Sequence, residues 1–174
     1  GLKPSCVVIV ATIRALKMHG GVEKENLKKE DTHALKKGLV NLERHILNIK
    51  KFGLEPIVAI NHFALDTKKE IEVVLNFCKN MDVQVSECKH WAMGGKGTTD
   101  LAKKVVKTCK DSKKNNFKLL YEDNLNLWDK IEKIVKEIYR GNGITANEDV
   151  KEQLKVFENN GYKSLPVCIA KTQY

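Results

Sequence analysis

Short apolar runs alternate with longer amphipathic segments over the first two thirds of the chain. The runs at 6–11 and 57–60 are rich in valine and isoleucine, which is typical of strands buried in a parallel sheet, and a third strand is predicted at about 83–88. Between them, apolar residues recur every three or four positions, which predicts helices near 30–51 and from about 68. This order of elements indicates an α/β fold with a mainly parallel sheet and flanking helices.

Turn and cap residues mark the ends of these elements. Gly53 stands where a helix C-terminal glycine belongs, and Thr67 with Glu70 fits a capping box at the start of a helix. The last third changes character, and we expect one portion over 1–140 and a second over 141–174. The predicted elements of the last third of the chain are a helix at about 126–140, a helix at about 147–159 closed by Gly161, and a strand at 166–170.

The composition is that of a globular chain of domain size. It has 174 residues, of which 42% are apolar and 30% charged, and no apolar run approaches the roughly 18–20 residues of a membrane helix. The five cysteines are widely spaced without a CxxC pair and mostly lie in apolar runs, so we expect reduced, buried thiols and a cytoplasmic location. Because the chain lacks an initiator methionine and its ends lie beside predicted strands, we expect a fragment of a longer enzyme.

A formal net charge of +9 favours anionic partners. The lysines are spread along the whole chain rather than gathered in one basic arm, so the charge is weak evidence for nucleic acid. Nucleotides and carboxylate-rich small molecules fit this charge better.

Unusual residues follow each of the three predicted strands. Ligands of open parallel sheets bind outside the carboxyl ends of the strands, so these residues form the candidate site. They are Arg14, Lys17 and His19 after the first strand, Asn61 to Asp66 after the second, and His90, Trp91 and a glycine-rich loop after the third.

Phe63 and Trp91 are the most informative of these residues, because each is a large aromatic side chain in a polar loop. If both face one cleft, they could sandwich a flat heterocycle such as a purine or pterin, and each face would contribute roughly 1–3 kcal/mol. Each could equally be a residue of a minor core.

The glycine-rich loop has the ingredients of an anion site, since Gly94, Gly95 and Gly97 precede a helix N-terminus. It is not a Walker A loop, because it lacks the pattern G-x-x-x-x-G-K-[ST], and Asp100 would repel phosphate. A plain turn from strand to helix fits these residues equally well. No cluster has metal-ligand spacing, and no nucleophile with its base can be recognised.

The remaining polar candidates have plainer interpretations. The segment from Asn61 to Asp66 loosely resembles the N-K-x-D loop that reads nucleotide bases, but the spacing is five rather than three, and we favour Asp66 as a helix cap. Lys96 and Lys171 could contact anions, although solvated lysines are the default in this chain. The functions of Arg14, Lys17 and His19 stay open.

Five long motifs closely resemble the formate–tetrahydrofolate ligase family over nearly the whole chain. They are VATIRALKMHGG at 10–21, NIKKFG at 48–53, VAINHFALDT at 58–67, HWAMGGKG at 90–97 and LPVCIAKTQY at 165–174. The resemblance implies a middle-to-C-terminal fragment with an architecture like that of P-loop NTPases, from which the P-loop segment itself is missing.

The family uses ATP and Mg²⁺ to join formate to tetrahydrofolate through formyl phosphate, giving 10-formyltetrahydrofolate. Phe63 and Trp91 match its aromatic pair that stacks on the folate ring, with Asn61 and the glycine loop shaping the site. The resemblance implies small-molecule substrates, a homo-oligomeric parent enzyme without nucleic acid or membrane partners, and a fragment inactive alone. It assigns no catalytic residue and no metal ligand here. A non-catalytic folate- or nucleotide-binding module is the alternative.

Overall fold

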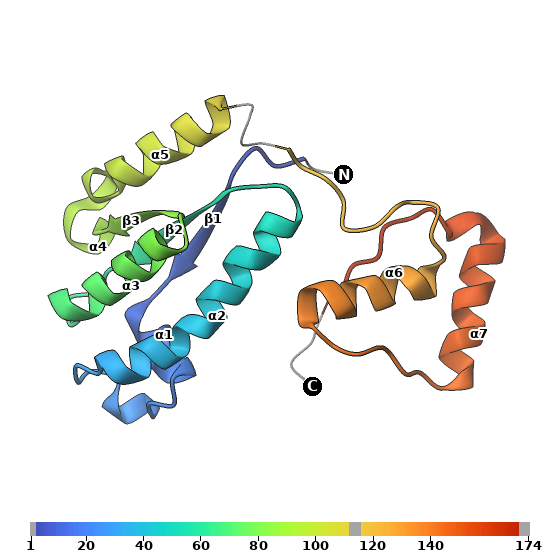
Figure 1. Ribbon diagram of the computed structural model, residues 1–174, viewed down its shortest axis with the longest axis horizontal. Coiled ribbons are helices and arrows are strands. Elements are labelled where there is room, and N and C mark those ends of the chain that lie inside the picture. Colours follow the sequence, from blue (N-terminus) through green and yellow to red (C-terminus); the bar gives the residue numbers. More distant parts are fainter. Residues whose placement is uncertain (1–2, 112–115, 171–174) are drawn as a thin grey trace. The chain divides into compact units, whose positions relative to one another are not determined.

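The computed structural model describes residues 3–111 and 116–170 of the chain. Contacts within the chain divide it into two compact units, Gly1–Lys118 and Leu119–Tyr174. The first unit contains the sheet, coloured blue to yellow in Figure 1, and the described part of the second contains helices without strands. The helix expected near 126–140 belongs to the second unit.

A parallel sheet of three strands forms the centre of the first unit. The strands are β1 (Val7–Ala11), β2 (Pro56–Asn61) and β3 (Gln84–Cys88), and they lie side by side in the order β1-β2-β3. The central strand β2 is buried along its length up to Asn61, which is half-buried. The predicted α/β fold with a parallel sheet is therefore confirmed.

Helices lie on both faces of this sheet. In Figure 1, α2 and α3 lie on one side of the strands and α5 on the other. The helices of the first unit are α1 (Ile13–His19), α2 (Thr32–Lys51), α3 (Lys68–Asn80), α4 (His90–Met93) and α5 (Thr99–Lys110), with 3-10 turns at Lys24–Asn26 and Gly94–Thr98. Side chains of α1, α2 and α3 form one apolar core with the sheet, which includes Ile13, Leu35, Ile46, Val58, Ile60 and Val74.

The predicted helix ends are confirmed at α2 and α3. The hydroxyl of Thr67 accepts the N–H of Glu70 at 3.3 Å, and the Glu70 carboxylate accepts the N–H of Thr67 at 3.1 Å, which makes a complete capping box. Gly53 follows the end of α2 with a φ of 72°, a left-handed conformation that a side chain disfavours.

Two glycines let α1 and α2 approach each other closely. A Cβ atom on Gly38 would lie 1.8 Å from the carbonyl oxygen of Leu16, and one on Gly20 would lie 1.8 Å from that of Ala34. Each helix thus presents a glycine to the backbone of the other. No sequence pattern had singled out these positions.

A buried ion pair joins α1 to the start of α3. The ammonium of Lys17 lies 2.8 Å from the Glu70 carboxylate, and both side chains are buried. The ammonium also donates to the carbonyl of Lys29 at 2.8 Å, while Glu70 accepts the N–H of Asp31 at 3.1 Å. Burial alone would raise the pKa of Glu70, but the hydrogen bonds from Lys17 and from the N–H groups of Thr67 and Asp31 outweigh it and lower that pKa.

The second unit consists of two helices and the segments around them. Helix α6 (Leu127–Ile134) continues as a π-helical turn over Val135–Tyr139, and α7 (Glu148–Phe157) continues over Glu158–Tyr162. Both helices occur where the sequence predicts them. Gly161, with a φ of 87°, breaks the helical conformation as expected.

The fully buried amine of Lys130 lies inside this second unit. It donates to the carbonyls of Lys163 at 2.6 Å and Leu165 at 3.1 Å, and it lies 5.8 Å from the ring centroid of Tyr121. Lys130 therefore ties the segment that follows α7 back to α6.

The strand predicted at 166–170 is wrong. These residues have no strand structure, and the described part of the second unit holds no other strand with which they could pair. The backbone of Val167 bonds instead to the hydroxyl of Tyr121, which accepts its N–H at 2.8 Å and donates to its carbonyl at 3.3 Å. An apolar run therefore did not suffice to make a strand.

All five thiols are free, as expected, but only Cys78 and Cys88 are buried, whereas Cys109 and Cys168 are exposed. Burial raises the pKa of Cys78 to about 11. Within the described ranges, no helix has the length and apolar character needed to cross a membrane.

Candidate functional site

The carboxyl ends of the three strands bring the main sequence candidates to one edge of the sheet. Arg14 lies in the first turn of α1, just after β1, while Phe63 follows β2 and Trp91 follows β3 in α4. Because the strands are parallel and adjacent, these three side chains come from neighbouring strand ends.

Phe63 and Trp91 lie close together at this edge. Their ring centroids are 6.2 Å apart with an angle of 39° between the ring planes, which is within the range of aromatic contacts. Trp91 is 73% exposed, and the ring of His90 lies 6.5 Å from it. The two aromatic side chains therefore face one another, and Trp91 is open to solvent.

Arg14 completes this aromatic group. The guanidinium carbon of Arg14 lies 5.2 Å from the centroid of the Phe63 ring, within the distance of a cation–π interaction. The sequence pattern placed Arg14 correctly at the carboxyl ends of the strands, but it did not predict the contact of Arg14 with Phe63. It positions a permanent positive charge beside the aromatic pair.

The loop after β2 is closed by Asp66. The N–H of Phe63 donates to the Asp66 carboxylate at 2.8 Å, and the N–H of Asp66 donates to the carbonyl of Phe63 at 2.9 Å. Burial raises the pKa of Asp66, although the Phe63 hydrogen bond and the nearby His62 and Arg14 oppose this shift. The preferred interpretation of Asp66 as a helix cap is wrong, because Thr67 caps α3 and Asp66 fixes the backbone of Phe63.

A second polar group lies between the ends of β2 and β3. Nδ1 of His62 lies 2.5 Å from the Glu87 carboxylate, and the ammonium of Lys89 lies 3.2 Å from the same oxygen. Burial would raise the pKa of Glu87, but its hydrogen bonds from His62 and Lys89 lower it overall. Glu87 is thus a carboxylate that is already engaged by two side chains, His62 and Lys89.

The family model described as "Formate--tetrahydrofolate ligase" matches residues 1–174. Among curated proteins, the chain is 56% identical over 173 residues to the formate–tetrahydrofolate ligase of Pelagibacter ubique and 53% identical over 174 residues to that of Staphylococcus aureus strain Newman. The chain belongs to the formate–tetrahydrofolate ligase family. The matches cover 99% and 100% of the chain but 31% of each relative, so the chain spans about a third of their length.

The glycine loop folds into α4 and the 3-10 turn after it. The close packing of the loop explains the glycine at position 97, because a Cβ atom there would lie 2.5 Å from the backbone of Lys89. Gly94 has a positive φ of 54°, whereas Gly95 has open space around it. The Asp100 carboxylate accepts the Ser86 hydroxyl at 2.6 Å and also pairs with Lys104, so its charge is engaged rather than free to repel an anion.

The other sequence candidates of this ligase-family chain have diverse positions. Lys17 belongs to the buried ion pair, His19 is the last residue of α1, Lys96 lies in the 3-10 turn and Lys171 lies outside the described residues. Asn61 ends β2, and its side-chain oxygen is buried without a hydrogen-bond partner among the described residues. The structure gives no partner for Asn61 that explains this burial.

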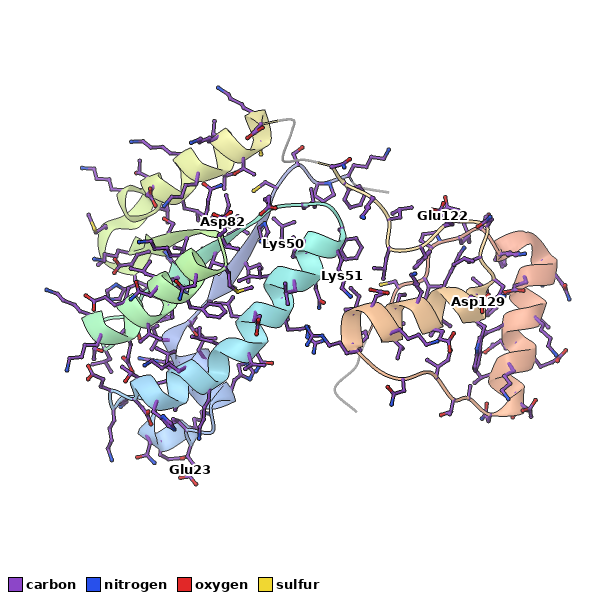
Figure 2. All side chains as sticks on the ribbon, viewed as in Figure 1. Glu23, Lys50, Lys51, Asp82, Glu122 and Asp129 are labelled. Carbon is purple, nitrogen blue, oxygen red and sulfur yellow. The ribbon has the colours of Figure 1, made fainter. Side chains whose placement is uncertain are left out.

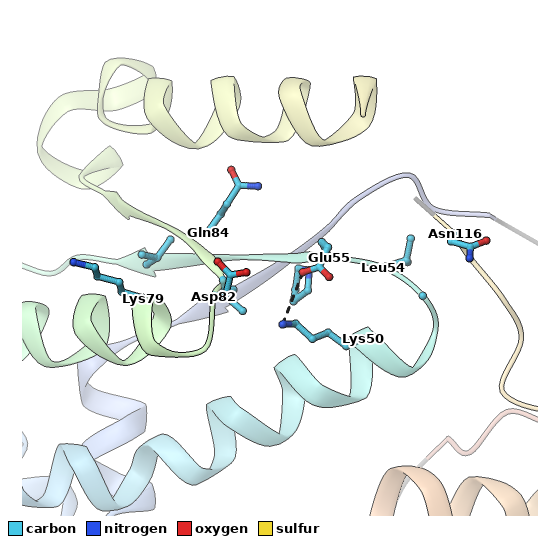
Figure 3. Close-up of a pocket in the computed structure, with 11 residues that line it drawn as sticks. Lys50, Leu54, Glu55, Lys79, Asp82, Gln84 and Asn116 are labelled. Atoms are coloured by element: carbon cyan, nitrogen blue, oxygen red, sulfur yellow. Dashed lines mark ion pairs between the residues drawn. The ribbon is translucent and has the colours of Figure 1, made fainter. Parts of the chain in front are cut away.

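A hollow lies at the opposite end of the strands, near their amino ends. It has a volume of about 590 Å³ and is lined by residues near the amino ends of β2 and β3, among them Lys50, Glu55, Lys79 and Asp82 (Figure 3). Lys50 lies 3.9 Å from Glu55, so the hollow carries paired charges of both signs. Since ligands of parallel sheets bind at the carboxyl ends of the strands, the aromatic group is the better candidate site.

Proposed function

We propose that this chain is part of an ATP-dependent ligase that joins formate to tetrahydrofolate, and that Phe63 and Trp91 bind the pterin ring. The observation that carries this proposal is the facing aromatic pair at the carboxyl edge of the sheet. The names of the relatives support the reaction, because both are formate–tetrahydrofolate ligases more than half identical to this chain.

Ring binding between the two side chains needs a small rearrangement. Stacked carbon atoms lie about 3.5 Å apart, so a ring between two parallel rings needs about 7 Å, whereas the observed rings lie 6.2 Å apart at their centroids and are tilted by 39°. Phe63 is held by Arg14 and by the Asp66 hydrogen bond to its backbone, whereas Trp91 is exposed. We propose that Trp91 turns outward to admit the pterin while Phe63 stays in place.

The residues of this chain indicate which part of the proposed reaction they serve. In the proposed ligase, a formate oxygen attacks the γ-phosphate of ATP to give formyl phosphate and ADP, and a nitrogen of tetrahydrofolate then displaces phosphate and loses its proton to form 10-formyltetrahydrofolate. Phe63 and Trp91 would hold and orient the folate, and the guanidinium of Arg14 would offer its charge to an anionic group nearby. No residue of this chain is assigned to proton transfer.

The described residues of this chain form no metal site of their own. The described ranges contain no group of three or more His, Cys, Asp or Glu side chains able to hold a metal ion, and the sequence lacks a P-loop motif. The proposal therefore places ATP and Mg²⁺ on the remaining two thirds of the polypeptide. It also retains a homo-oligomeric, cytoplasmic parent enzyme with small-molecule substrates and without nucleic acid or membrane partners.

Replacement of Trp91 with alanine tests the proposed pterin site. Loss of one stacking face is expected to weaken tetrahydrofolate binding by about 1–3 kcal/mol, roughly 5- to 150-fold in Kd, as measured by isothermal titration calorimetry. Trp128→Ala in α6 is the matched control and should leave Kd unchanged. Equal Kd values for wild type and Trp91→Ala would remove the stacking proposal.

The alternative is a folate- or nucleotide-binding module without catalysis, which the absence of a P-loop motif from this sequence favours. Formation of 10-formyltetrahydrofolate from ATP, formate and tetrahydrofolate separates the possibilities. The ligase proposal expects no turnover by these 174 residues alone and turnover by the complete polypeptide that contains them. Turnover by the isolated chain would contradict the proposal that ATP and Mg²⁺ bind to the rest of the polypeptide. An inactive complete polypeptide would favour the binding module.

A further inference from the structure

Two cysteines that are far apart in the sequence lie at the same end of the sheet. Cys6 directly precedes β1, and Cys109 is the last residue but one of α5. In Figure 1, the last turn of α5 and the start of β1 lie at the same end of the first unit. The fold therefore brings the two thiols together at the amino ends of the strands.

The hydrogen bonds of α5 hold its last turn above these strand ends. Gln84, the first residue of β3, donates to the Thr108 hydroxyl at 3.1 Å, and Cys109 is the next residue of the helix. The row of paired residues that contains Gln84 runs across β2 to Val8 in β1. Cys6 lies two positions before Val8, so its side chain lies on the same face of the sheet, toward α5.

The thiols of Cys6 and Cys109 are in hydrogen-bonding contact with each other. Burial raises the pKa of Cys6, and the neighbouring Cys109 thiol raises it further, against a backbone hydrogen bond that lowers it. Cys6 is half-buried, whereas Cys109 is exposed. The other thiols are placed differently, because Cys78 and Cys88 are buried and Cys168 belongs to the second unit.

Lysines surround the exposed thiol of Cys109. Lys107 and Lys110 lie beside it in the last turn of α5, and together with Lys103 they line a hollow of about 530 Å³ along the helix. Positive charges raise the local concentration of anions, so an anionic reagent reaches this thiol more often than a neutral one. Glutathione disulfide is a reagent of this class, because it carries several carboxylates.

We propose that Cys6 and Cys109 form an oxidation-sensitive dithiol pair, which a small anionic disulfide such as glutathione disulfide converts to an intramolecular disulfide. The Cys109 thiolate attacks one sulfur of the oxidant, which forms a mixed disulfide and releases one glutathione thiolate. The Cys6 thiolate then attacks the Cys109 sulfur and displaces the second glutathione. The protein dithiol loses two electrons and two protons, and the oxidant gains both as two molecules of reduced glutathione.

The new bond would join the start of β1 to the end of α5. Thiols that already contact each other need little backbone movement to form a disulfide. Arg14, Phe63 and Trp91 all lie between the two cysteines in the sequence, so the bond would enclose the candidate site in a covalent loop of roughly 100 residues. Long loops are those in which a cross-link restricts the unfolded chain most.

Peptide mapping of the complete polypeptide tests this pair. The protein is incubated with glutathione disulfide, its remaining thiols are blocked with a maleimide, and the digest is examined by mass spectrometry without reduction. The peptide that links Cys6 to Cys109 should exceed any other linkage of either residue by at least roughly 10-fold, because its second step is intramolecular, and dithiothreitol should remove it. If neither thiol is oxidised, or if Cys109 carries glutathione without the link to Cys6, the proposal is wrong.

Cys109→Ser and Cys168→Ser are the matched variants, because each removes an exposed thiol. Cys109→Ser should abolish the cross-link and leave Cys6 free, whereas Cys168→Ser should leave the yield of the link between Cys6 and Cys109 unchanged. A mixture of isotope-labelled and unlabelled protein needs no substitution, so it decides the question even where a variant folds poorly. Linked peptides with one labelled and one unlabelled half would overturn the proposal, because they would identify a bond between two chains.

Discussion

Glu70→Ala is expected to lower the free energy of unfolding by about 3–5 kcal/mol. The substitution leaves the buried ammonium of Lys17 without its carboxylate, and it also removes acceptors for the N–H groups of Asp31 and Thr67. An unpaired buried charge costs far more than a solvent-exposed one, because the interior cannot solvate it. Urea denaturation followed by circular dichroism would measure the loss.

Glu72→Ala is the matched control for this prediction. Glu72 lies on the same helix as Glu70 but is exposed, so its loss should change the free energy of unfolding by no more than about 0.5 kcal/mol. The double variant Lys17→Met with Glu70→Leu should recover part of the stability, because it removes both charges together but leaves the N–H groups of Asp31 and Thr67 without this acceptor. Equal effects of Glu70→Ala and Glu72→Ala would show that the ion pair contributes nothing.

The same carboxylate makes stability depend on pH. The pKa of Glu70 is lowered in the folded protein, so the unfolded chain takes up its proton first as the pH falls. The stabilisation is therefore complete above the ordinary glutamate pKa of about 4.3 and is lost as the pH falls through the folded value. Glu70→Gln should lack this part of the acid transition in a series of urea denaturations.

Gly38→Ala is expected to destabilise the chain by about 3 kcal/mol, although alanine is the better helix former by about 1 kcal/mol. The added methyl would lie 1.8 Å from the carbonyl oxygen of Leu16, which belongs to backbone and cannot turn away. The helices α1 and α2 would have to separate, and the apolar contacts between them would loosen. Thermal and urea denaturation would both report the change.

Gly95→Ala is the control for Gly38→Ala. A methyl group on Gly95 would have no atom within 4 Å, and Gly95 has no positive φ, so its substitution should leave stability almost unchanged. If Gly38→Ala were as stable as wild type or more so, the close approach of α1 and α2 would be refuted. The helix propensity of alanine alone would then determine the effect of the substitution at position 38.

The sequence was sufficient wherever one local rule decided the structure. The β-branched runs became β1 and β2, and the shorter alternating segment that begins at Val83 became β3. The capping box at Thr67 was also visible, because all of its atoms lie within four residues. At the predicted strand 166–170, by contrast, pairing needed a neighbour that the described part of the second unit does not provide.

Side-chain partners distant in the sequence were harder to predict. Asp66 has the residue type and position of a helix cap, and only the three-dimensional loop shows that it bonds to Phe63 instead. The contact of Arg14 with Phe63 likewise depends on how α1 leaves the sheet. Lys130 did carry a signal, since it lies three residues after the buried Leu127 and four before Ile134, on the apolar side of α6.

Charged side chains line the outer surfaces of both units in Figure 2, and the chain has 28 lysines whose amines an acylating reagent can modify. Lys17 and Lys130 differ, because their amines are enclosed, one in each unit. An acylating reagent can reach either amine only when the surrounding unit opens. Each half of the chain therefore contains its own chemical indicator of local unfolding, and the order in which the two amines are acylated reveals which unit opens first.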